Sequence, residues 1–566
     1  MKPMFSPGNF RFLLSVSAMM AFVSSSALAQ TWNGGGDGVS WSDPANWAGG
    51  LPNVDTQTRF LTGSLPDAPL VIVVDGTTAP FKNVNFAIGG NRTLTIQGGT
   101  LYLETTPSSA TIQWNSSFEN PAPVIINSDI VYTSVESGSA IFSINPGGRT
   151  ITFNGNITPT GEGGRQMTLS GAGVIVINGS NGASNLSFTM SGELIVGNLH
   201  ALGAGQISRS GSGGILSLRS DVIVANNGSY SWLHSGTSYF RISEENFSTV
   251  DRTITMTGRL AANQNSPEAT IEFLENVNSS GNLILDLKYS GGTVQSVHLV
   301  TNDNTIVRFS QTGNTTYTGL IGGSGRVEKV VGTGTTTFTQ ANTYTGETLI
   351  GAGTLALGAD GGIANSSHII LGTASTLGTL DVSAKSSFAF GEAQKVSGRG
   401  TIRIGEGKTI TVAGELAPGA EGAGQINVTG NLTLGNTATT TMKLAGLGGV
   451  AGADFDNVTV SGDLLYNGTL SIVMSGALDT GEGTSFNLFD FASRSGNFDA
   501  VTFNGNALVY DGGLWSGAHG NYVYSFTLDT GVFTITTVIP EPGAALLLLL
   551  GAGVMPLYRR RNRKGV

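Results

Sequence analysis

The body of the chain consists of short segments in which polar and apolar residues alternate, and this period of two most restricts the possible folds. The segments are rich in β-branched residues, and Gly, Asn and Ser clusters separate them about every 8 to 12 residues. Examples are residues 93–96, 173–177, 253–256, 409–412 and 431–434. No amphipathic helix pattern is convincing between residues 30 and 540, so the sequence predicts an all-β fold.

A degenerate repeat runs through this body. Tyr317-Thr318-Gly319 recurs 27 residues later as Tyr344-Thr345-Gly346, and the second copy continues into residues 347–358. Periods of about 20 to 30 residues with strand content indicate a solenoid, in which each coil buries its apolar face only by stacking on its neighbours. We expect coils of roughly 22 residues.

The segment from Gly322 to Gly358 resembles the autotransporter-associated β-strand repeat, and weaker echoes occur at residues 171–203 and 414–446. This resemblance implies a right-handed parallel β-helix, that is, a solenoid of strands. We place the β-helical repeat region at residues 61–450, with the clearest repeat at 322–358.

Both ends of such a solenoid need a cap, because an open end presents unpaired strand edges. Residues 30–60 are rich in tryptophan, and we expect Trp32, Trp41 and Trp47 to seal the first coil as an N-terminal cap. Phenylalanines crowd the chain toward its C-terminal end, so residues 451–538 are expected to form a C-terminal β cap or a small β domain.

The first 29 residues have the three parts of a signal peptide. Lys2 and Arg11 are basic, residues 12–23 are mostly apolar, and Ala27-Leu28-Ala29 is a small-residue cleavage site. We expect signal peptidase to cut after Ala29, so that the exported protein begins at Gln30.

The last residues form a second targeting segment, at 539–566. Pro540-Glu541-Pro542 precedes an apolar run from Gly543 to Leu557, which predicts a short hydrophobic helix of about 22 Å. A basic cluster follows at Arg559, Arg560, Arg561 and Arg563. The positive-inside rule places this cluster in the cytoplasm and everything before Pro540 outside the membrane.

This tail resembles the PEP-CTERM sorting signal of Gram-negative bacteria, which is also labelled an ice-binding protein C-terminal domain. The resemblance implies processing at Pro540, Glu541 and Pro542 by a membrane transpeptidase of the exosortase type. It also implies transient anchoring in the inner membrane, followed by delivery to the cell surface or the extracellular matrix. The simpler alternative is a plain C-terminal membrane anchor.

Composition excludes several classes of function. Cysteine is absent, so disulfides, thiolate metal sites and cysteine nucleophiles are excluded. The two targeting segments hold seven of the 28 basic residues and one of the 38 acidic residues, which leaves 21 basic and 37 acidic residues in the body, a net charge of −16. Because nucleic-acid binding needs clustered Lys and Arg, we expect no nucleic-acid partner.

Few residues suggest catalysis. The five histidines form no H-x-x-x-H metal pair: they are His200, His234, His298, His368 and His519. Three local carboxylate pairs could serve the acid–base chemistry of polysaccharide-cleaving enzymes: Glu244 with Glu245, Glu272 with Glu275, and Asp454 with Asp456. We interpret all of them as surface or turn residues, and we predict no catalytic residue and no bound metal.

Two further features offer weaker alternatives. Residues 34–38 and 452–456 faintly resemble calcium-binding turns but lack the tandem copies that supply six or more oxygens, so calcium remains an alternative to having no cofactor. Five tryptophans are candidates for stacking on sugar rings, although caps and cores use this residue more often: Trp41, Trp47, Trp114, Trp232 and Trp515.

The sequence therefore favours an exported bacterial surface or matrix protein with a structural or adhesin-like role, and extracellular polysaccharide is a candidate partner. One alternative is a glycan- or ice-binding protein, which would need a flat row of Thr or Asn on one face. The run from Thr333 to Thr337 suggests such a row. The other alternative is a β-helical enzyme that acts on polysaccharide, which would need about three converging acidic or basic side chains.

Overall fold

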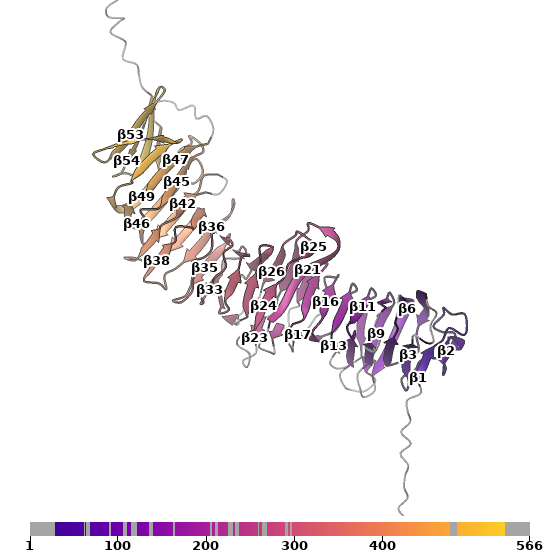
Figure 1. Cartoon of the computed structure of the whole chain (residues 1–566). Coiled ribbons are helices and arrows are strands. Elements are labelled where there is room, and N and C mark those ends of the chain that lie inside the picture. Colours follow the sequence, from indigo (N-terminus) through magenta and orange to yellow (C-terminus); the bar gives the residue numbers. More distant parts are fainter. Residues whose placement is uncertain are drawn as a thin grey trace, which may run out of the picture.

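The computed structural model describes residues 29–537 with short gaps, and this part of the chain is all-β, as predicted (Figure 1). The gaps are residues 62, 64–67, 90–91, 106–109, 115–121, 135–139, 162–164, 204–205, 210–212, 225–229, 233–236, 258–259, 263–268, 289–292, 295–296, 420–421 and 476–483. The expected signal peptide up to Leu28 and the expected sorting tail at residues 539–566, with its predicted hydrophobic helix, lie outside the described residues. Within the described part, no helix has the length and apolar character needed to cross a membrane.

Two ladders of paired strands dominate the N-terminal half. The first contains, in spatial order, β2 (Trp47–Ala48), β1 (Ala29–Trp32), β3 (Gln57–Leu61), β5 (Asn83–Ala87), β7 (Ala110–Trp114), β10 (Ala140–Asn145), β13 (Arg165–Gly171), β15 (Asn185–Met190), β17 (Gln206–Arg209), β20 (Tyr230–Trp232) and β23 (Leu260–Ala262). The second contains β12 (Ile157–Thr160), β9 (Asp129–Ser134), β6 (Leu94–Thr105), β8 (Val124–Ile126), β11 (Arg149–Phe153), β14 (Gly173–Ile177), β16 (Glu193–Val196), β18 (Ile215–Leu218), β21 (Thr237–Ser248), β24 (Thr270–Phe273), β28 (His298–Thr301) and β31 (Ile321–Gly323), with β4 (Leu70–Thr77) beside β6 and β25 (Val277–Ser279) beside β21.

Two more ladders continue toward the C-terminus. The third contains β19 (Val222–Val224), β22 (Arg252–Met256), β26 (Leu283–Leu287), β29 (Thr305–Phe309), β32 (Arg326–Lys329), β34 (Thr348–Ile350), β36 (His368–Leu371), β39 (Lys395–Gly398), β42 (Glu415–Pro418), β45 (Thr439–Leu444), β47 (Thr469–Met474), β50 (Ala500–Phe503) and β51 (Asn506–Ala507). The fourth contains β27 (Thr293–Val294), β30 (Thr315–Tyr317), β33 (Thr335–Phe338), β35 (Gly353–Leu357), β37 (Gly378–Asp381), β40 (Gly400–Arg403), β43 (Gln425–Thr429), β46 (Asn457–Tyr466), β44 (Asn431–Leu434), β41 (Thr409–Val412) and β38 (Ser387–Phe390), with β49 (Phe489–Gly496) beside β46.

The chain visits the ladders in turn and then returns to its starting ladder one strand further along. β29, β30 and β31 lie in the third, fourth and second ladders, and β32 then pairs in parallel with β29, with Val307 opposite Val327. We call one such passage a coil. Stacked coils produce the elongated, bent body of the molecule (Figure 1).

The coils differ in length more than the expected value of roughly 22 residues suggests. Residues in register are 19 apart between Val174 and Glu193, but 33 apart between Ser238 and Ile271. In the region of the clearest repeat the offset is 21 residues, as between Val327 and Thr348. The strands hold the register, whereas the turns between them absorb the extra residues.

The two Tyr-Thr-Gly copies do not stack on each other. Tyr317 ends β30 and pairs with Phe338 in the fourth ladder. Tyr344 lies in the connection between β33 and β34, where the backbone N–H of Thr343 donates to the carbonyl of Ile321 at 2.9 Å. The motif spacing of 27 residues is therefore not the coil period, and the alignment of these two copies was a wrong guide to the register.

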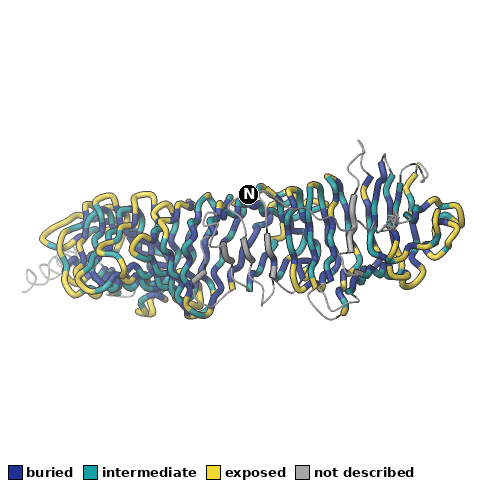
Figure 2. The backbone as a smooth tube through the Cα atoms, turned by 90° about the horizontal axis from the view of Figure 1, so that it is seen from below, coloured by how far each residue is buried: buried dark blue, intermediate teal, exposed yellow. Residues whose placement is uncertain are grey.

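One continuous hydrophobic core fills the stack. Burial alternates along most strands, so that the core-facing residues are buried and their neighbours are partly exposed (Figure 2). Core residues of successive coils lie in register and form rows of similar side chains. One such row is Leu355, Leu380, Ile402, Val428 and Val460, all of which are buried.

Three tryptophans pack at the N-terminal end of this core. The ring centroid of Trp47 lies 5.0 Å from that of Trp32 and 4.9 Å from that of Trp41, in edge-on contacts. All three are buried, and they lie against Phe60 of β3. The indole N–H of Trp47 donates to the carbonyl of Trp41 at 2.9 Å. The short 3-10 helix η1 (Pro44–Asn46) precedes Trp47 and turns the chain into this cluster.

At the other end, parallel pairing continues past residue 450, where we had placed the boundary of the repeat region. β47 and β50 still pair in parallel, with Leu470 opposite Val501. An antiparallel sheet follows, which contains β48 (Thr484–Asn487), β55 (Val532–Thr537), β54 (Tyr522–Thr527), β53 (Leu514–His519) and β52 (Val509–Asp511). Phe526 of this sheet contacts Tyr466 and Phe489 of the stack, so aromatic packing joins the two parts.

We predict that Phe338→Ala lowers the free energy of unfolding by about 3–5 kcal/mol, because it empties a fully buried position between Phe309 and Tyr317. Urea denaturation followed by circular dichroism measures this loss. Thr337→Ala is the matched control in the same strand. It faces outward, and we expect a change of about 0.5 kcal/mol or less. Equal losses in the two variants would contradict the assignment of faces.

Candidate functional site

The tryptophans proposed as sugar-stacking platforms are not available for that role where the structure describes them. Trp41, Trp47 and Trp515 are buried, with 4%, 3% and 7% of their surface exposed. Trp41 and Trp47 belong to the N-terminal aromatic cluster, and the indole N–H of Trp515 donates to Asn497 at 2.9 Å. The side chains of Trp114 and Trp232 lie outside the described residues.

The carboxylate pairs named from the sequence do not converge on a cleft. Glu244 forms an ion pair with Arg252 at 2.5 Å, whereas its neighbour Glu245 pairs with Arg219 at 2.5 Å. Glu272 lies within β24, and Glu275 follows the end of that strand and is exposed. Glu244 and Glu245 therefore pair with different arginines, and Glu275 lies outside the strand that holds Glu272.

The two turns compared with calcium sites are organised by their own hydrogen bonds. The carboxylate of Asp37 accepts hydrogen bonds from the backbone N–H groups of Val39 and Ser40 and from the side chain of Asn46, at 2.7–2.9 Å. The hydroxyl of Ser40 also donates to Asp37 and has the largest effect. Together these hydrogen bonds hold the pKa of the Asp37 carboxyl well below its ordinary value. Across the described residues, no group of three or more His, Asp or Glu side chains is placed to hold a metal ion.

Asp454 and Asp456 hold loops in place. Asp454 accepts from the backbone N–H of Val450 at 2.9 Å. Asp456 is fully buried, and its two oxygens accept from the backbone N–H groups of Gly424 and Lys443, each at 2.8 Å. Burial raises the pKa of Asp456 to about 7, although both of these donors favour the carboxylate.

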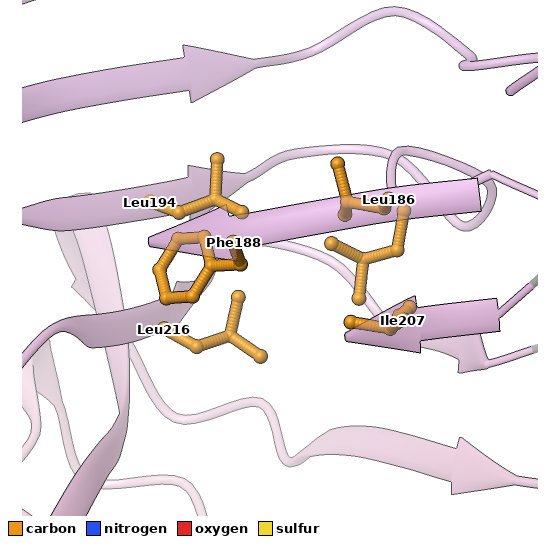
Figure 3. A pocket seen from close by; sticks show the side chains of 6 residues that line it. Leu186, Phe188, Leu194, Ile207 and Leu216 are labelled. Atoms are coloured by element: carbon orange, nitrogen blue, oxygen red, sulfur yellow. The ribbon is translucent and has the colours of Figure 1, made fainter. Parts of the chain in front are cut away.

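One void in the described core of the stack is too small for a ligand. An apolar void of about 10 Å³ lies among side chains of β15, β16, β17 and β18 (Figure 3). Its lining residues are Leu186, Phe188, Leu194, Leu202, Ile207 and Leu216. A cavity of this volume holds at most about one water molecule, and its apolar walls offer water no partner, so we assign the void to core packing.

The outer surface of the fourth ladder carries a regular row of short uncharged polar side chains, which we call the threonine row. Successive strands β33, β35, β37, β40, β43 and β46 place these residues opposite one another: Thr335, Thr354, Thr379, Thr401, Asn427 and Thr459. All six are partly exposed. Because parallel neighbours lie about 4.8 Å apart, the row presents one hydroxyl or amide per coil at a nearly constant spacing.

A second row lies two residues further along these strands and begins one strand earlier, on β30. It starts with Thr316 and Thr337, continues with Ala356, and then carries the ion pair Asp381 with Arg403 at 3.4 Å before Thr429. The expected run from Thr333 to Thr337 thus contributes Thr335 and Thr337 to the surface. Thr336 points into the core and is fully buried.

The first ladder places a similar row on the N-terminal half. Ser143, Thr168 and Ser187 occupy one register position on successive strands and are partly exposed.

Five successive coils of the third ladder carry charged or titratable residues at one register position, which continues into Thr439 and Thr469. Arg326, Glu347, His368, Lys395 and Glu415 follow one another across coils, and we call them the ionic row. The ring of His368 lies 3.4 Å from Glu347 and 2.7 Å from the hydroxyl of Ser397. Burial lowers the pKa of His368 against the opposing effect of Glu347. The sequence reading of His368 as a surface or turn residue missed this arrangement.

The sequence contained a local sign of the threonine row that the sequence analysis did not use. The triplets Gly353-Thr354-Leu355, Gly378-Thr379-Leu380 and Gly400-Thr401-Ile402 have one pattern, with a glycine at the corner, an outward threonine and a core residue. Their irregular spacing hides the repeat from a search at a fixed period. Of the other histidines, His200 and His519 are exposed, His298 accepts from the backbone N–H of Leu320 at 3.2 Å, and His234 lies outside the described residues.

Comparison with known proteins found no match to this chain among family models, curated proteins or solved structures. The resemblances described from the sequence, at residues 322–358 and 539–566, therefore stay predictions.

We predict that the free energy of unfolding falls as the pH rises from about 4 to about 7, because folding raises the pKa of Asp456 above the ordinary value of about 3.9. The folded state then binds the proton more tightly, and this contribution is lost as the pH passes the folded pKa. Asp456→Asn removes that dependence and costs about 1–3 kcal/mol, since its amide group faces a backbone N–H.

Urea denaturation of both proteins at pH 5 and pH 7.5 measures these effects. Asp511→Asn, at an exposed position of β52, is the control and should retain the wild-type dependence. An unchanged pH dependence in Asp456→Asn would show that another group is responsible.

Proposed function

We propose that this chain is an exported structural or adhesin-like protein of the bacterial cell surface or extracellular matrix, built as a right-handed parallel β-helix. The observation that carries the proposal is the long stack of parallel ladders with a continuous core. Parallel strand connections are right-handed in nearly all known cases, which supports the handedness. A stack in which each coil contacts only its neighbours suits a rigid spacer that can be lengthened coil by coil.

The positions of the two ends support display from a surface. The first described strand, β1, and the last, β55, lie at opposite ends of the elongated body (Figure 1). A tail that holds the C-terminal end, first in the inner membrane and then at the cell surface, would project the N-terminal tryptophan cluster outward. The proposed processing partners are signal peptidase, at Ala29 and Gln30, and an exosortase-type transpeptidase, at Pro540, Glu541 and Pro542.

A second candidate function is binding of a linear polysaccharide, and the threonine row favours it. Hydroxyl and amide groups at one per coil can donate to and accept from the hydroxyls of an extended sugar chain. Ice binding is the less favoured reading of the same row, because the charged pair Asp381 and Arg403 interrupts the second row beside it. No specific observation on the described residues favours a polysaccharide-cleaving enzyme, because the carboxylate pairs named from the sequence do not converge.

The sorting proposal predicts that Glu541→Ala leaves the protein in the inner membrane. The short hydrophobic helix and its basic cluster hold the chain there, and only processing at the extended Pro540-Glu541-Pro542 segment releases the body. Membrane fractionation and immunoblotting of cells that express each form measure the difference. Identical retention of wild type and variant would favour a plain membrane anchor. In that case Glu541 lies outside the hydrocarbon of the membrane, and its substitution should change nothing.

The binding proposal predicts that Thr379→Val combined with Thr401→Val weakens binding of a β-1,4-linked neutral hexasaccharide by about tenfold, since two hydroxyl contacts are lost without a change of shape. Isothermal titration calorimetry measures the affinity. The control pair is Thr411→Val with Thr433→Val, on neighbouring strands β41 and β44. Equal affinities for all three proteins would exclude the threonine row as the binding surface.

A further inference from the structure

One corner of the stack, between the second and third ladders, projects from the body (Figure 1). The flanking coils turn this corner with residues 219–221 and 302–304 alone. In the two coils between them, residues 243–251 and 274–282 form longer excursions, in which the second half of β21 pairs with β25. We call this projection the flap. The chain is described without a gap through residues 237–257 and 269–288, which contain it.

Hydrogen bonds and an ion pair fix the base of the flap to the stack. Glu244 pairs with Arg252 at 2.5 Å, and the side chain of Asn276 accepts from the backbone N–H of Ile242 at 3.0 Å. The backbone N–H of Ser280 donates to the carbonyl of Ser248 at 3.0 Å. The outer residues of the flap are therefore presented at a defined position.

A bulge in β21 carries these outer residues. β21 and β25 are in register where Ser243 lies opposite Val277, and again where Ser248 lies opposite Ser279. Residues 244–247 of β21 therefore stand opposite the single residue Asn278. A bulge leaves its extra residues outside the regular hydrogen-bonded ladder, so this part of β21 is not enclosed between two strands.

The flap exposes apolar side chains that the fold does not explain. Phe247 on the bulge has 72% of its surface exposed, Val250 has 54% and Val277 has 37%. Single exposed apolar residues are ordinary, but several on one projecting element mark a surface that another group covers.

The bulge also holds an acceptor motif. Asn246-Phe247-Ser248 has the pattern Asn-x-Ser/Thr, which N-linked glycosylation uses on the surface of exported proteins. Asn246 is exposed, and its side-chain amide makes no hydrogen bond to any part of the chain that the structure describes. At Ser248, β21 pairs with β25 alone.

The same pattern occurs elsewhere, and the structure separates those positions from Asn246. In six cases the hydroxyl residue lies in a strand that pairs with neighbours on both sides: Asn185, Asn314, Asn427, Asn431, Asn457 and Asn467. In four more the amide group is hydrogen bonded at 2.7–3.5 Å: Asn156 to Ser180, Asn178 to Asn154, Asn278 to Glu244, and Asn365 to Thr343. The motifs at Asn91, Asn115 and Asn227 lie outside the described residues. Among the described motifs, Asn246 alone has a free amide and an open flank.

We propose that Asn246 is the acceptor of an N-linked oligosaccharide that is attached after export. The donor is a lipid diphosphate-linked oligosaccharide, and a transferase of the producing cell catalyses the step. A bond forms between Nδ2 of Asn246 and C1 of the first sugar, and the bond from this C1 to the diphosphate oxygen breaks. The diphosphate leaves with the electron pair, and the amide proton passes to a base of the transferase.

The attached oligosaccharide also accounts for the apolar surface of the flap. Its first sugar is bonded to the residue beside Phe247, so the apolar face of a sugar ring can cover the phenyl ring while the sugar hydroxyls face water. The inference rests on the proposed export of the chain and is independent of polysaccharide binding at the threonine row.

Mass spectrometry of the protein isolated from the cells that naturally produce it tests the proposal. Trypsin cuts after Arg241 and Arg252, so residues 242–252 form one peptide with Asn246 as its only asparagine. We expect this peptide to carry an oligosaccharide on Asn246. The tryptic peptide of residues 409–443 is the internal control. Both of its motifs, at Asn427 and Asn431, lie in enclosed strands, and we expect it to be unmodified.

Two variants test the motif itself. Ser248→Ala removes the required hydroxyl and should abolish the modification, whereas Ser248→Thr keeps the hydroxyl and should retain it. Ser248 is partly exposed, and melting temperatures confirm that both variants fold. Without its oligosaccharide, Ser248→Ala should bind a hydrophobic dye more strongly than the wild type, and the further change Phe247→Ser should reverse this gain.

The outcomes separate this inference from the proposed function. An unmodified peptide 242–252 in a protein that begins at Gln30 would overturn the glycosylation site and leave export standing. An unmodified peptide together with an intact Met1 would overturn both. Modification that persists in Ser248→Ala, or that extends to the control peptide, would overturn the assignment of Asn246 from its exposure and open flank.

Discussion

The parallel hydrogen-bonded ladder between successive coils is the interaction on which the rest of this structure depends. A coil of 19 to 33 residues cannot bury its own apolar side chains, and it gains a core only when the next coil stacks on it in register. The register of the strands therefore fixes the positions of the core-facing residues and of the outward-facing residues together. When Leu355 stands over Leu380 inside, Thr354 must stand over Thr379 outside, because alternate residues of a strand face opposite ways. The alignment of the threonine row is thus a consequence of an ordered core, whereas the choice of threonine at these outward positions is not.

The fold class was predictable from the sequence, whereas the register was not. The period of two and the turn residues depend on local chemistry, and local chemistry is legible in a single strand. The register depends on which turns contain additional residues. Lengthening a turn costs little free energy once the two strands that flank it are paired. For this reason the two Tyr-Thr-Gly copies, which look like one repeat, lie on different sides of their coils.

The threonine row, too, was only partly predictable from the sequence. Thr335 and Thr337 could be picked out from the sequence because they lie close together in one strand, but Thr379, Thr401 and Asn427 become one surface only after three coils are aligned.

The outer faces of the third and fourth ladders carry different kinds of side chain. On the third ladder, the ionic row pairs its charges from coil to coil, so those groups satisfy one another and leave little net field. On the fourth ladder, the threonine row consists of groups that neutral hydroxyls can match without any cost of removing charge from water. Exposed ion pairs contribute little to stability, which makes the ionic row a poor explanation for why the stack holds together. The uncharged hydroxyls of the threonine row are instead the feature of this surface that supports the proposed polysaccharide partner.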